Sequence, residues 1–474
     1  MSVIEDIQTT DRDRAGFAWA QSVIGGTMVH RELQSRWRRQ WFLHFDTGAG
    51  EPVRVVMRGF RNPGYCDPDD SGVRARLEQE AGVLRALNDV PVRTPTFYGH
   101  DLENAWTLME FVDGEVQLTD EPDSDKRFRI YTGYVEELAK LHAHPLEGLD
   151  LPDTLFRPRT CAEYRQHLID EHLPFYRALS RKRAEPTMEI GLQWTLANPL
   201  PDERPIGLGF GDVGPNQFLY VGDKFNSFID VEYARIADPL SEMGQMRSRD
   251  VTYHSGRMVE HLRHYGDVYE KLTGVSLSIP SLNYWTVAGP ALWNVFTVAG
   301  AQQGDGRMID LPFALAYEVQ QKRCILEGLA EIHGVRLSCP EMPSEVDTSL
   351  SGVHDALVSQ FEDYYLPRAT DAMDRTVLRY TASMAQTLRR GNALLPELDR
   401  QNLEELSDVL GHRPASLAAG LFQLEEAIAA DHMHDFDRRL NFLYRLEVRR
   451  DYLYQPMQTA TQVSLSRPMS RFDA

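Results

Sequence analysis

The chain has 474 residues, of which 42% are apolar and 25% charged, so it can bury the cores of two or three globular domains and is not a disordered chain. Lysine and arginine number 50 against 70 aspartates and glutamates, and the net charge of −20 disfavours binding to nucleic acid or to an anionic membrane surface. No stretch reaches the roughly 18 consecutive apolar residues that span a membrane, and the N-terminus lacks the apolar core of a secretion signal.

The cysteines support the expectation of a cytoplasmic protein, and the basic residues do not form an obvious nucleic-acid site. The four cysteines lie far apart without a CxxC or a Cys/His cluster, which argues against a zinc site and against a disulfide scaffold. The one dense basic run, residues 36–39, leads directly into an aromatic segment, and we interpret it as the end of a strand.

The first part of the chain, residues 1–112, is predicted to be a small α+β unit. An aromatic run at 41–45 and a β-branched run at 53–57 flank a turn-forming segment and indicate two paired strands. Apolar residues at helical spacing predict a helix over Ser71–Leu87. A further apolar run at 106–112 predicts another strand, which would end at a turn.

Beyond residue 112 the pattern is mainly helical, interrupted by loop and strand character around 207–231. A proline- and serine-rich stretch near residue 340 predicts a linker. Apolar stripes at helical spacing follow it and predict a helical bundle, with a last helix that ends before Pro456. We therefore predict an α+β unit, a helix-rich unit, a linker, a helical bundle and a tail, at residues 1–112, 113–335, 336–352, 353–455 and 456–474.

The segment around Asp223 carries the residues with chemical potential. Two strand-like runs flank a turn centred on Asp223 and predict a β-hairpin. Asn216 precedes Asp223 by seven residues and Asp230 follows it by seven. Because positions equidistant from a turn lie opposite each other in an antiparallel pair, these two side chains should meet at the open end of the hairpin. Asp212 lies one loop earlier.

An amide oxygen beside a carboxylate suits Mg²⁺, and a second carboxylate nearby could orient a hydroxyl group and accept its proton. This set of groups is typical of phosphoryl transfer, although Asp and Asn in a glycine-containing loop are more often simple turn formers. The glycines at 209, 211 and 214 also match a dinucleotide-binding fingerprint. We reject it because Pro215 and a strand-like run follow in place of the required helix, and no P-loop motif is present.

The order of several motifs resembles one known family. The motifs are Val55-Val56-Met57-Arg58, the helix with Glu80, Leu108-Met109-Glu110-Phe111-Val112, Phe210-Gly211-Asp212, Asn216, Ile229-Asp230-Val231-Glu232 and Asp238-Pro239. Together they resemble the aminoglycoside-phosphotransferase-like branch of the protein-kinase-like fold over residues 20–335. The likeness is closest to phosphotransferases found beside or fused to acyl-CoA dehydrogenases. Residues 353–455 resemble a helical domain of unknown function that accompanies such enzymes.

This resemblance implies an α+β, bilobal fold with a small β-rich, nucleotide-binding N-lobe and a helical, catalytic and acceptor-binding C-lobe, followed by an all-α bundle. ATP would lie between the lobes with its adenine against the backbone of Glu110 and Val112. Arg58, at a position where the family usually has Lys, would hold the α- and β-phosphates. Glu80 would orient Arg58.

The resemblance also implies that Asn216 and Asp230 bind Mg²⁺ and that Asp212 takes the proton of the acceptor hydroxyl. Phe210 replaces the family histidine, which is thought to brace the loop, so an aromatic ring could substitute by packing. Glu232 is interpreted either as a residue behind the site or as a solvated strand end.

We expect the acceptor to be a hydrophobic alcohol or a hydroxyacyl-CoA, because an aromatic stretch from Tyr284 to Phe296 would lie on the acceptor side; the same pattern is also typical of a core. One alternative is a kinase-like pseudoenzyme that binds ATP or acts as a scaffold through its helical C-terminal domain. Another is an aminoglycoside-type antibiotic phosphotransferase. If the protein self-associates or has a protein partner, residues 353–455 are the expected contact region.

Overall fold

The computed structural model describes residues 9–35, 38–61, 71–253, 257–303, 311–462 and 468–472. Contacts divide the chain into two compact units, each discontinuous in sequence. Unit 1 comprises Met1–Arg157, Ile206–Ala237 and His264–Val275, and unit 2 comprises Pro158–Pro205, Asp238–Arg263 and Ser276–Ala474. The five-part division expected from the sequence stays a prediction. Within the described residues, none of the helices has the length and apolar character needed to cross a membrane.

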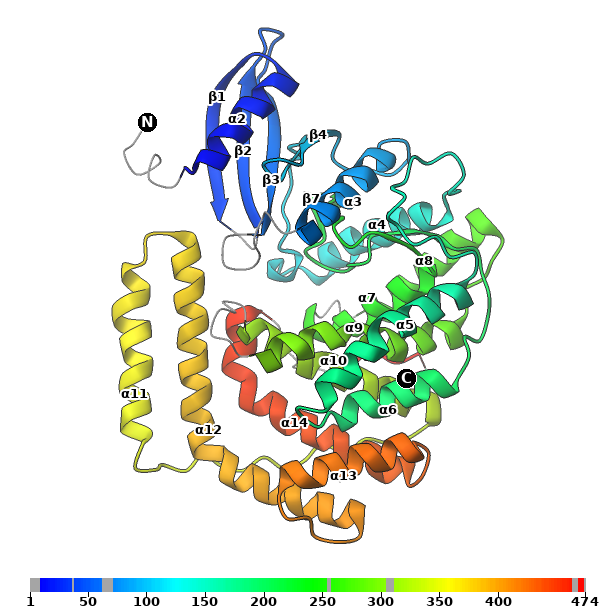
Figure 1. Ribbon diagram of the computed structural model, residues 1–474, viewed down its shortest axis with the longest axis vertical. Helices are drawn as coiled ribbons and strands as arrows, with labels where there is room; N and C mark the ends of the chain where they lie inside the picture. Colours follow the sequence, from blue (N-terminus) through cyan, green and yellow to red (C-terminus); the bar gives the residue numbers. More distant parts are fainter. Residues whose placement is uncertain are drawn as a thin grey trace. The chain divides into compact units, whose positions relative to one another are not determined.

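A five-stranded antiparallel sheet forms the first part of unit 1 (Figure 1), in the order β1-β2-β3-β5-β4. The strands are β1 Thr27–Ser35, β2 Arg38–Asp46, β3 Val53–Arg61, β4 Phe97–Asp101 and β5 Trp106–Glu110. Trp41 pairs with Met57 and Leu43 pairs with Val55, which confirms the predicted strand pair.

Helix α2, Asp11–Ile24, packs on one face of this sheet and forms a core with Trp41 and its neighbours. Asp13 of this helix accepts hydrogen bonds from Trp41 Nε1 (2.8 Å) and Arg39 Nη2 (2.6 Å). Burial raises the pKa of Asp13, but the hydrogen bonds from Arg39, from Thr10 and from Trp41 lower it more, so it lies below its usual value. Because alternate strand residues point to opposite faces, the neighbouring Arg38 lies on the face away from α2.

The rest of unit 1 places two long helices and two short strand pairs after the sheet. These elements are α3 Ser71–Leu87, the 3₁₀ turn η1 Leu118–Asp120, α4 Ser124–Ala143, β6 Gly207–Gly209, β7 Phe218–Val221, β8 Lys224–Phe228 and β9 Arg235–Ala237. β6 pairs with β9 and β7 pairs with β8, both antiparallel. The α3 helix has the predicted bounds.

The regular elements of unit 2 are all helices in the described residues. Its helices are α5 Cys161–Ser180, α6 Pro186–Ala197, α7 Pro239–Tyr253, α9 Ile279–Gln303, α10 Leu311–His333, α11 Ser351–Ser359, the π-helical turn η2 Gln360–Tyr365, the 3₁₀ turn η3 Leu366–Arg368, α12 Ala372–Leu410, α13 Leu417–Ala430 and α14 Phe436–Thr461, while α8 Met258–Thr273 contributes to both units. The linker expected at 336–352 has no helix or strand before α11. The predicted α+β class, β-rich near the N-terminus and helical toward the C-terminus, is confirmed.

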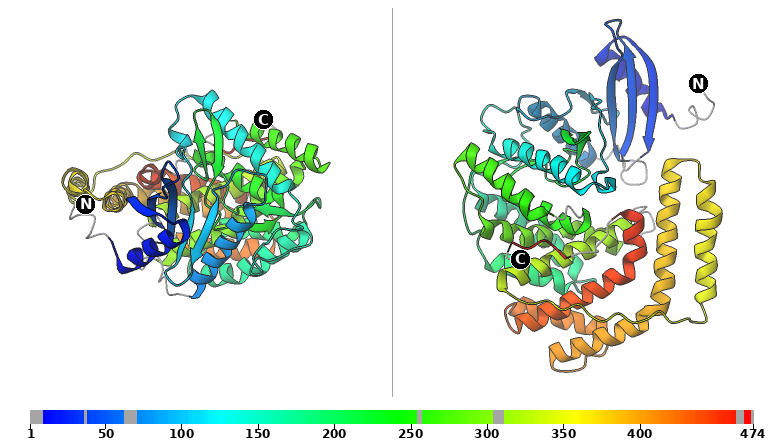
Figure 2. Two further views of the ribbon diagram at one scale, coloured as in Figure 1. Left: turned by 90° about the horizontal axis from the view of Figure 1, so that it is seen from above. Right: turned by 180° about the vertical axis from the view of Figure 1, so that it is seen from behind.

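Two details of the C-terminal helices differ from the prediction. The last helix does not stop before Pro456, because α14 continues through it to Thr461. A proline inside a helix costs about 3 kcal/mol, and the packing of α14 along α10 and α12 outweighs this cost. The two stripes expected near residues 373–388 and 403–410 belong to one helix of 39 residues, α12. Figure 2 shows α12 running beside α11.

Candidate active site

The β7–β8 hairpin of unit 1 has the register predicted from the sequence. Phe218 pairs with Phe228, and the Ile229 N–H donates to the Gln217 carbonyl (3.2 Å). Asn216 and Asp230 are the next residues outward on the two sides of the hairpin, at its open end. Nearer the tip the pairing shifts by one residue at a bulge.

Asn216 and Asp230 share an unusual backbone conformation. Their φ angles are 70° and 66°, in the left-handed region that residues with a Cβ rarely occupy. Each such residue costs about 1 kcal/mol, and Asn and Asp tolerate the region better than other side chains. Backbone strain of this kind concentrates at functional sites, and here it falls on both residues that the sequence assigns to metal binding.

The loop between β6 and β7 holds Asp212. Gly211 has φ of 74°, and a Cβ at this position would lie 1.9 Å from the carbonyl oxygen of Tyr233, so the loop and the turn before β9 are in close backbone contact. Asp212 Oδ2 accepts a hydrogen bond from Gln217 Nε2 (2.8 Å). The Asp212 side chain is only partly buried, and the surrounding backbone fixes its place.

A cluster of packed aromatic rings supports the loop that holds Asp212. Phe210, which stands where the resembled family has histidine, is buried and packs on Phe228 with 4.5 Å between ring centroids. Tyr134 of α4 stacks on Phe218 at 4.4 Å, and its hydroxyl oxygen accepts the N–H of Gly214 (3.0 Å). Phe210 therefore braces the loop by packing, as expected.

A network of five charged side chains adjoins the hairpin. Arg38 Nη1 donates to both oxygens of Glu80 (3.1 and 2.8 Å), and Arg38 Nη2 donates to Glu232. Arg58 Nη2 donates to Asp230 Oδ1 (2.6 Å), and Arg58 Nη1 lies 3.7 Å from Glu80 Oε1. The Glu80 side chain is 1% exposed and that of Asp230 29%, so the network runs from the core to the accessible Asp230.

The sequence interpretation missed one member of this network. The expected pair of Arg58 and Glu80 is present only as the longer ion pair, and the hydrogen bonds to Glu80 come from Arg38, which we had interpreted as part of a strand end. Burial lowers the pKa of Arg38, but the charges of Glu80, Glu232 and Asp230 raise it more, so it lies above its usual range. Glu232 is therefore paired with a buried cation and is not a solvated strand end.

Glu110, at the end of β5, is held by its side chain. Its carboxylate accepts hydrogen bonds from Thr96 N (3.1 Å), Thr96 Oγ1 (2.8 Å) and Arg93 Nη2 (3.1 Å). Burial raises the pKa of Glu110, but the hydrogen bonds from Thr96 and the charge of Arg93 lower it more, so it lies below its usual value. The carboxylate thus organises the end of the strand.

The segment after Glu110 is tied to the hairpin. The Phe111 N–H donates to the Arg54 carbonyl (3.1 Å), so the backbone of Val112, one residue on, follows a fixed path. Asn226 Nδ2 of the hairpin then donates to the carbonyl of Asp113 (2.7 Å). These contacts hold the expected adenine-binding segment and the expected metal-binding hairpin together within unit 1.

The buried polar atoms without a hydrogen-bond partner among the described residues include Asn216 Oδ1, Gln217 Oε1 and Arg58 Nε. An unsatisfied buried polar atom costs about 1–3 kcal/mol. Two of the atoms are oxygens suited to a hard cation such as Mg²⁺, and the third is a cationic donor suited to an anion. Mg²⁺ usually takes only one or two carboxylates, so the set fits although no cluster of three or more His, Cys, Asp or Glu occurs in the described parts.

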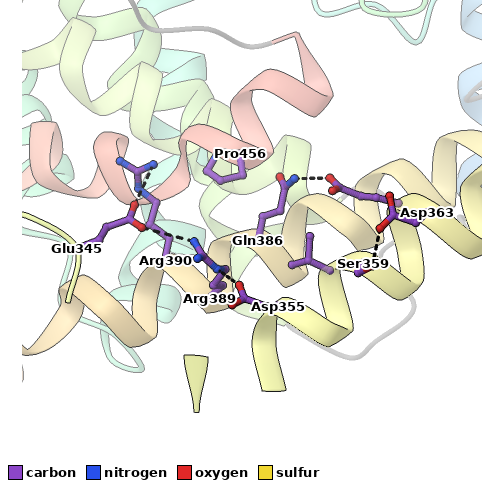
Figure 3. Close-up of a pocket in the computed structure, with 10 residues that line it drawn as sticks. Glu345, Asp355, Ser359, Asp363, Gln386, Arg389, Arg390 and Pro456 are labelled. Carbon is purple, nitrogen blue, oxygen red and sulfur yellow. Dashed lines mark hydrogen bonds and ion pairs between the residues drawn. The ribbon is translucent and has the colours of Figure 1, made fainter. Parts of the chain in front are cut away.

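Unit 2 contains a pocket of about 390 Å³ (Figure 3), which is a weaker candidate for an active site than the hairpin region of unit 1. It lies between α11 and α12, beside Pro456. Its charged groups pair with one another, since Arg389 bonds to Asp355 and both Arg389 and Arg390 lie within 3.7 Å of Glu345. The pocket thus offers no convergent set of reactive side chains.

The aromatic residues expected on the acceptor side are partly core residues. Tyr284 and Trp285 are buried within unit 2, and Trp285 Nε1 donates to Asp238 Oδ2 (2.7 Å). The same carboxylate oxygen pairs with Arg204 (2.5 Å), so Asp238 of the Asp-Pro motif is a buried structural residue. The side chains of residues 294–296 lie outside the described ones.

Several solved structures are similar to the chain. A candidate aminoglycoside phosphotransferase from Ralstonia eutropha JMP134 is 18% identical, with a TM-score of 0.49 over 66% of this chain and 98% of that one. A thermostable mutant of aminoglycoside phosphotransferase APH(4)-Ia, in a ternary complex with ADP and hygromycin B, is 13% identical, with a TM-score of 0.46 over 65% and 97%. Macrolide 2′-phosphotransferase MphH from Brachybacterium faecium is 16% identical, with a TM-score of 0.43 over 64% and 97%. Similarity of this extent says nothing about the substrate of this chain.

None of the curated proteins compared with the chain matches it. The model of the phosphotransferase enzyme family matches residues 31–274, which is more than half of the chain and includes every residue of the charged network. The closer likeness to phosphotransferases that accompany acyl-CoA dehydrogenases stays a prediction. The chain belongs to the phosphotransferase enzyme family, and the expectation of an enzyme of the phosphotransferase class is confirmed.

Proposed function

We propose that this protein transfers the γ-phosphoryl group of ATP to a hydroxyl group of a small molecule, with Mg²⁺ as cofactor. The observation that carries the proposal is the position of Asn216 and Asp230, which follow the paired ends of the hairpin with positive φ angles. Arg58 donates to Asp230 in the same place, and its Nε donor has no partner among the described residues. Oxygen ligands, a cation for phosphate and a nearby carboxylate are the groups that phosphoryl transfer requires.

The nucleotide would be held by two parts of unit 1, Arg58 and the segment from Glu110 to Val112. Arg58 would bind phosphate oxygens through its guanidinium, which forks to two oxygens and cannot lose its charge. The adenine would lie against the backbone of Glu110 and Val112. The N–H groups of Glu110 and Phe111 already donate to Thr96 and Arg54, so the carbonyl of Glu110 and the N–H of Val112 are the groups proposed to bond the base.

Asn216 and Asp230 would hold Mg²⁺, which when bound neutralises charge on the phosphate oxygens. Asp212 would accept the proton of the acceptor hydroxyl as that oxygen attacks the γ-phosphorus. Gln217 Nε2 donates to one carboxylate oxygen of Asp212 (2.8 Å) and so holds the carboxylate in the loop. Asp212 therefore positions the nucleophile as well as accepting its proton.

For the acceptor we propose a hydrophobic alcohol or a hydroxyacyl-CoA. This choice rests on the resemblance to phosphotransferases that accompany acyl-CoA dehydrogenases. The burial of Tyr284 and Trp285 in unit 2 removes their rings as a reason for it. An aminoglycoside is the competing acceptor, and a pseudoenzyme that binds ATP without transfer is the competing function.

Isothermal titration of ATP with and without Mg²⁺ tests the first half of the proposal. We expect binding that depends on Mg²⁺ and is lost in Asp230→Asn. The matched control is Asp223→Asn, which changes an acid at the exposed tip of the same hairpin. Binding that ignores Mg²⁺, or that the control weakens as much, would contradict the proposed site.

An ADP-release screen tests the second half. The arms are a hydrophobic alcohol, a hydroxyacyl-CoA ester and an aminoglycoside, each with the parent protein and with Asp212→Asn. We expect one acceptor to raise ADP release above the background ATPase rate in the parent protein alone. Mg²⁺-dependent ATP binding without acceptor-stimulated release would favour the pseudoenzyme.

A further inference from the structure

Two arginines and one buried glutamate occupy the centre of the charged network. Arg38 lies on β2 and Arg58 on the neighbouring strand β3, and both face Glu80 of α3. Gln40, two residues from Arg38 and therefore on the same face of β2, pairs directly with Arg58. The sheet thus brings two cations to one carboxylate.

The distances from each arginine to Glu80 and Asp230 indicate that the two arginines have different partners. Both oxygens of Glu80 accept hydrogen bonds from Arg38 Nη1, at 3.1 and 2.8 Å. Arg58 approaches only one of these oxygens, at 3.7 Å, which is beyond hydrogen-bond range, and its close contact is Asp230 at 2.6 Å. Arg38 is also the more buried side chain, 6% exposed against 14% for Arg58.

We propose that Arg38 is a positioning residue of the nucleotide site: it anchors Glu80 and Glu232, and so keeps Arg58 turned toward Asp230 and the phosphates. This inference rests on the proposed function. It assigns the anchoring of Glu80 to a residue on β2, where the resemblance gave that pairing to Arg58.

The shape of a guanidinium suits this task. Arg38 uses Nη1 for Glu80 and Nη2 for Glu232, so one planar group joins helix α3 to the turn that follows β8. A lysine carries a single nitrogen and cannot reproduce this fork. The two carboxylates keep Arg38 charged despite its burial.

Loss of Arg38 would change where Arg58 points. Glu80 is 1% exposed and would be left as a buried carboxylate without its two hydrogen bonds. A buried charge needs a partner, and among the described side chains Arg58 is a second cation close to Glu80, at 3.7 Å. Arg58 would therefore move to Glu80 and away from Asp230 and the nucleotide.

The experiment compares two adjacent arginines on opposite faces of β2. Arg38→Gln is expected to weaken Mg²⁺-dependent ATP binding at least tenfold in isothermal titration. Arg38→Lys is expected to bind ATP more tightly than Arg38→Gln but more weakly than the parent protein. The control Arg39→Gln removes the partner of Asp13 on the far face and is expected to lower the melting temperature while leaving ATP affinity within about twofold.

A second variant separates positioning from folding. Glu80→Gln combined with Arg38→Gln removes the charge that would capture Arg58, so ATP affinity should return to within about threefold of the parent. Unchanged affinity in Arg38→Gln, or failure of the double variant to recover it when folded, would overturn the inference. If the parent protein itself shows no Mg²⁺-dependent ATP binding, the proposed function fails instead.

Discussion

The contact between Gly211 and the Tyr233 carbonyl predicts that even one methyl group there disables the site. In Gly211→Ala the new Cβ would lie 1.9 Å from that oxygen, about 1.5 Å short of an ordinary contact near 3.4 Å. The positive φ of 74° adds about 1–2 kcal/mol of backbone strain, and the overlap adds about 1–3 kcal/mol. The clash must move either the loop with Asp212 or the turn with Glu232. A shift of about 1 Å at reacting groups costs about 100-fold in rate.

The measurements are ADP release and urea unfolding of Gly211→Ala beside a matched control. Gly222 at the hairpin tip also has a positive φ, 61°, but a Cβ there would meet nothing within 4 Å. We expect Gly222→Ala to lose only about 1–2 kcal/mol of stability, from backbone strain alone, and to keep the rate of the parent protein. Equal losses of stability in the two variants, together with a normal rate in Gly211→Ala, would refute the idea that this contact sets the position of Asp212.

Three further predictions concern single side chains. Asp212→Asn should lower acceptor-stimulated ADP release about 10²–10⁴-fold while ATP affinity in calorimetry stays within about twofold; a joint loss of both would argue against its role as the base. Asn216→Gly should raise the free energy of unfolding by up to about 1 kcal/mol, since glycine adopts a positive φ without strain, yet weaken Mg²⁺-dependent ATP binding; unchanged binding would remove Asn216 from the metal site. Asp13→Asn should lower stability by about 3 kcal/mol at neutral pH in urea unfolding. Because the folded pKa of Asp13 is lowered, this difference should persist above about pH 4 and fade as the pH falls through the folded pKa; a loss that does not change with pH would contradict the lowered pKa.

Local sequence patterns were enough to predict the parts of the candidate site that lie close together in sequence. The hairpin register follows from counting residues on either side of Asp223, because a short turn and a two-residue side-chain period determine which residues face each other. The same reasoning predicts that Asn216 meets Asp230. The packing role of Phe210 also follows, since its partner Phe228 lies on the adjoining hairpin.

Long-range pairings could not be predicted in this way. Arg38 meets Glu80 across 42 residues and Glu232 across 194, and nothing near Arg38 in the sequence indicates either partner. Pro456 led to a wrong prediction. Proline is a local signal for the end of a helix, but the packing of α14, which the sequence does not show, keeps the helix going through it. Local propensity is a weak guide wherever tertiary contacts decide the outcome.

The bulge in the β7–β8 hairpin separates its tip from its open end, where Asn216 and Asp230 lie. The tip pairs Val221 with Lys224 in one register, whereas Phe218 and Phe228 pair in another, and the second pair is clamped by aromatic packing. We therefore expect an added residue between Gly222 and Asp223 to be absorbed at the tip without shifting the pair of Phe218 and Phe228. This exposed tip is therefore a natural attachment point for a fluorescent label.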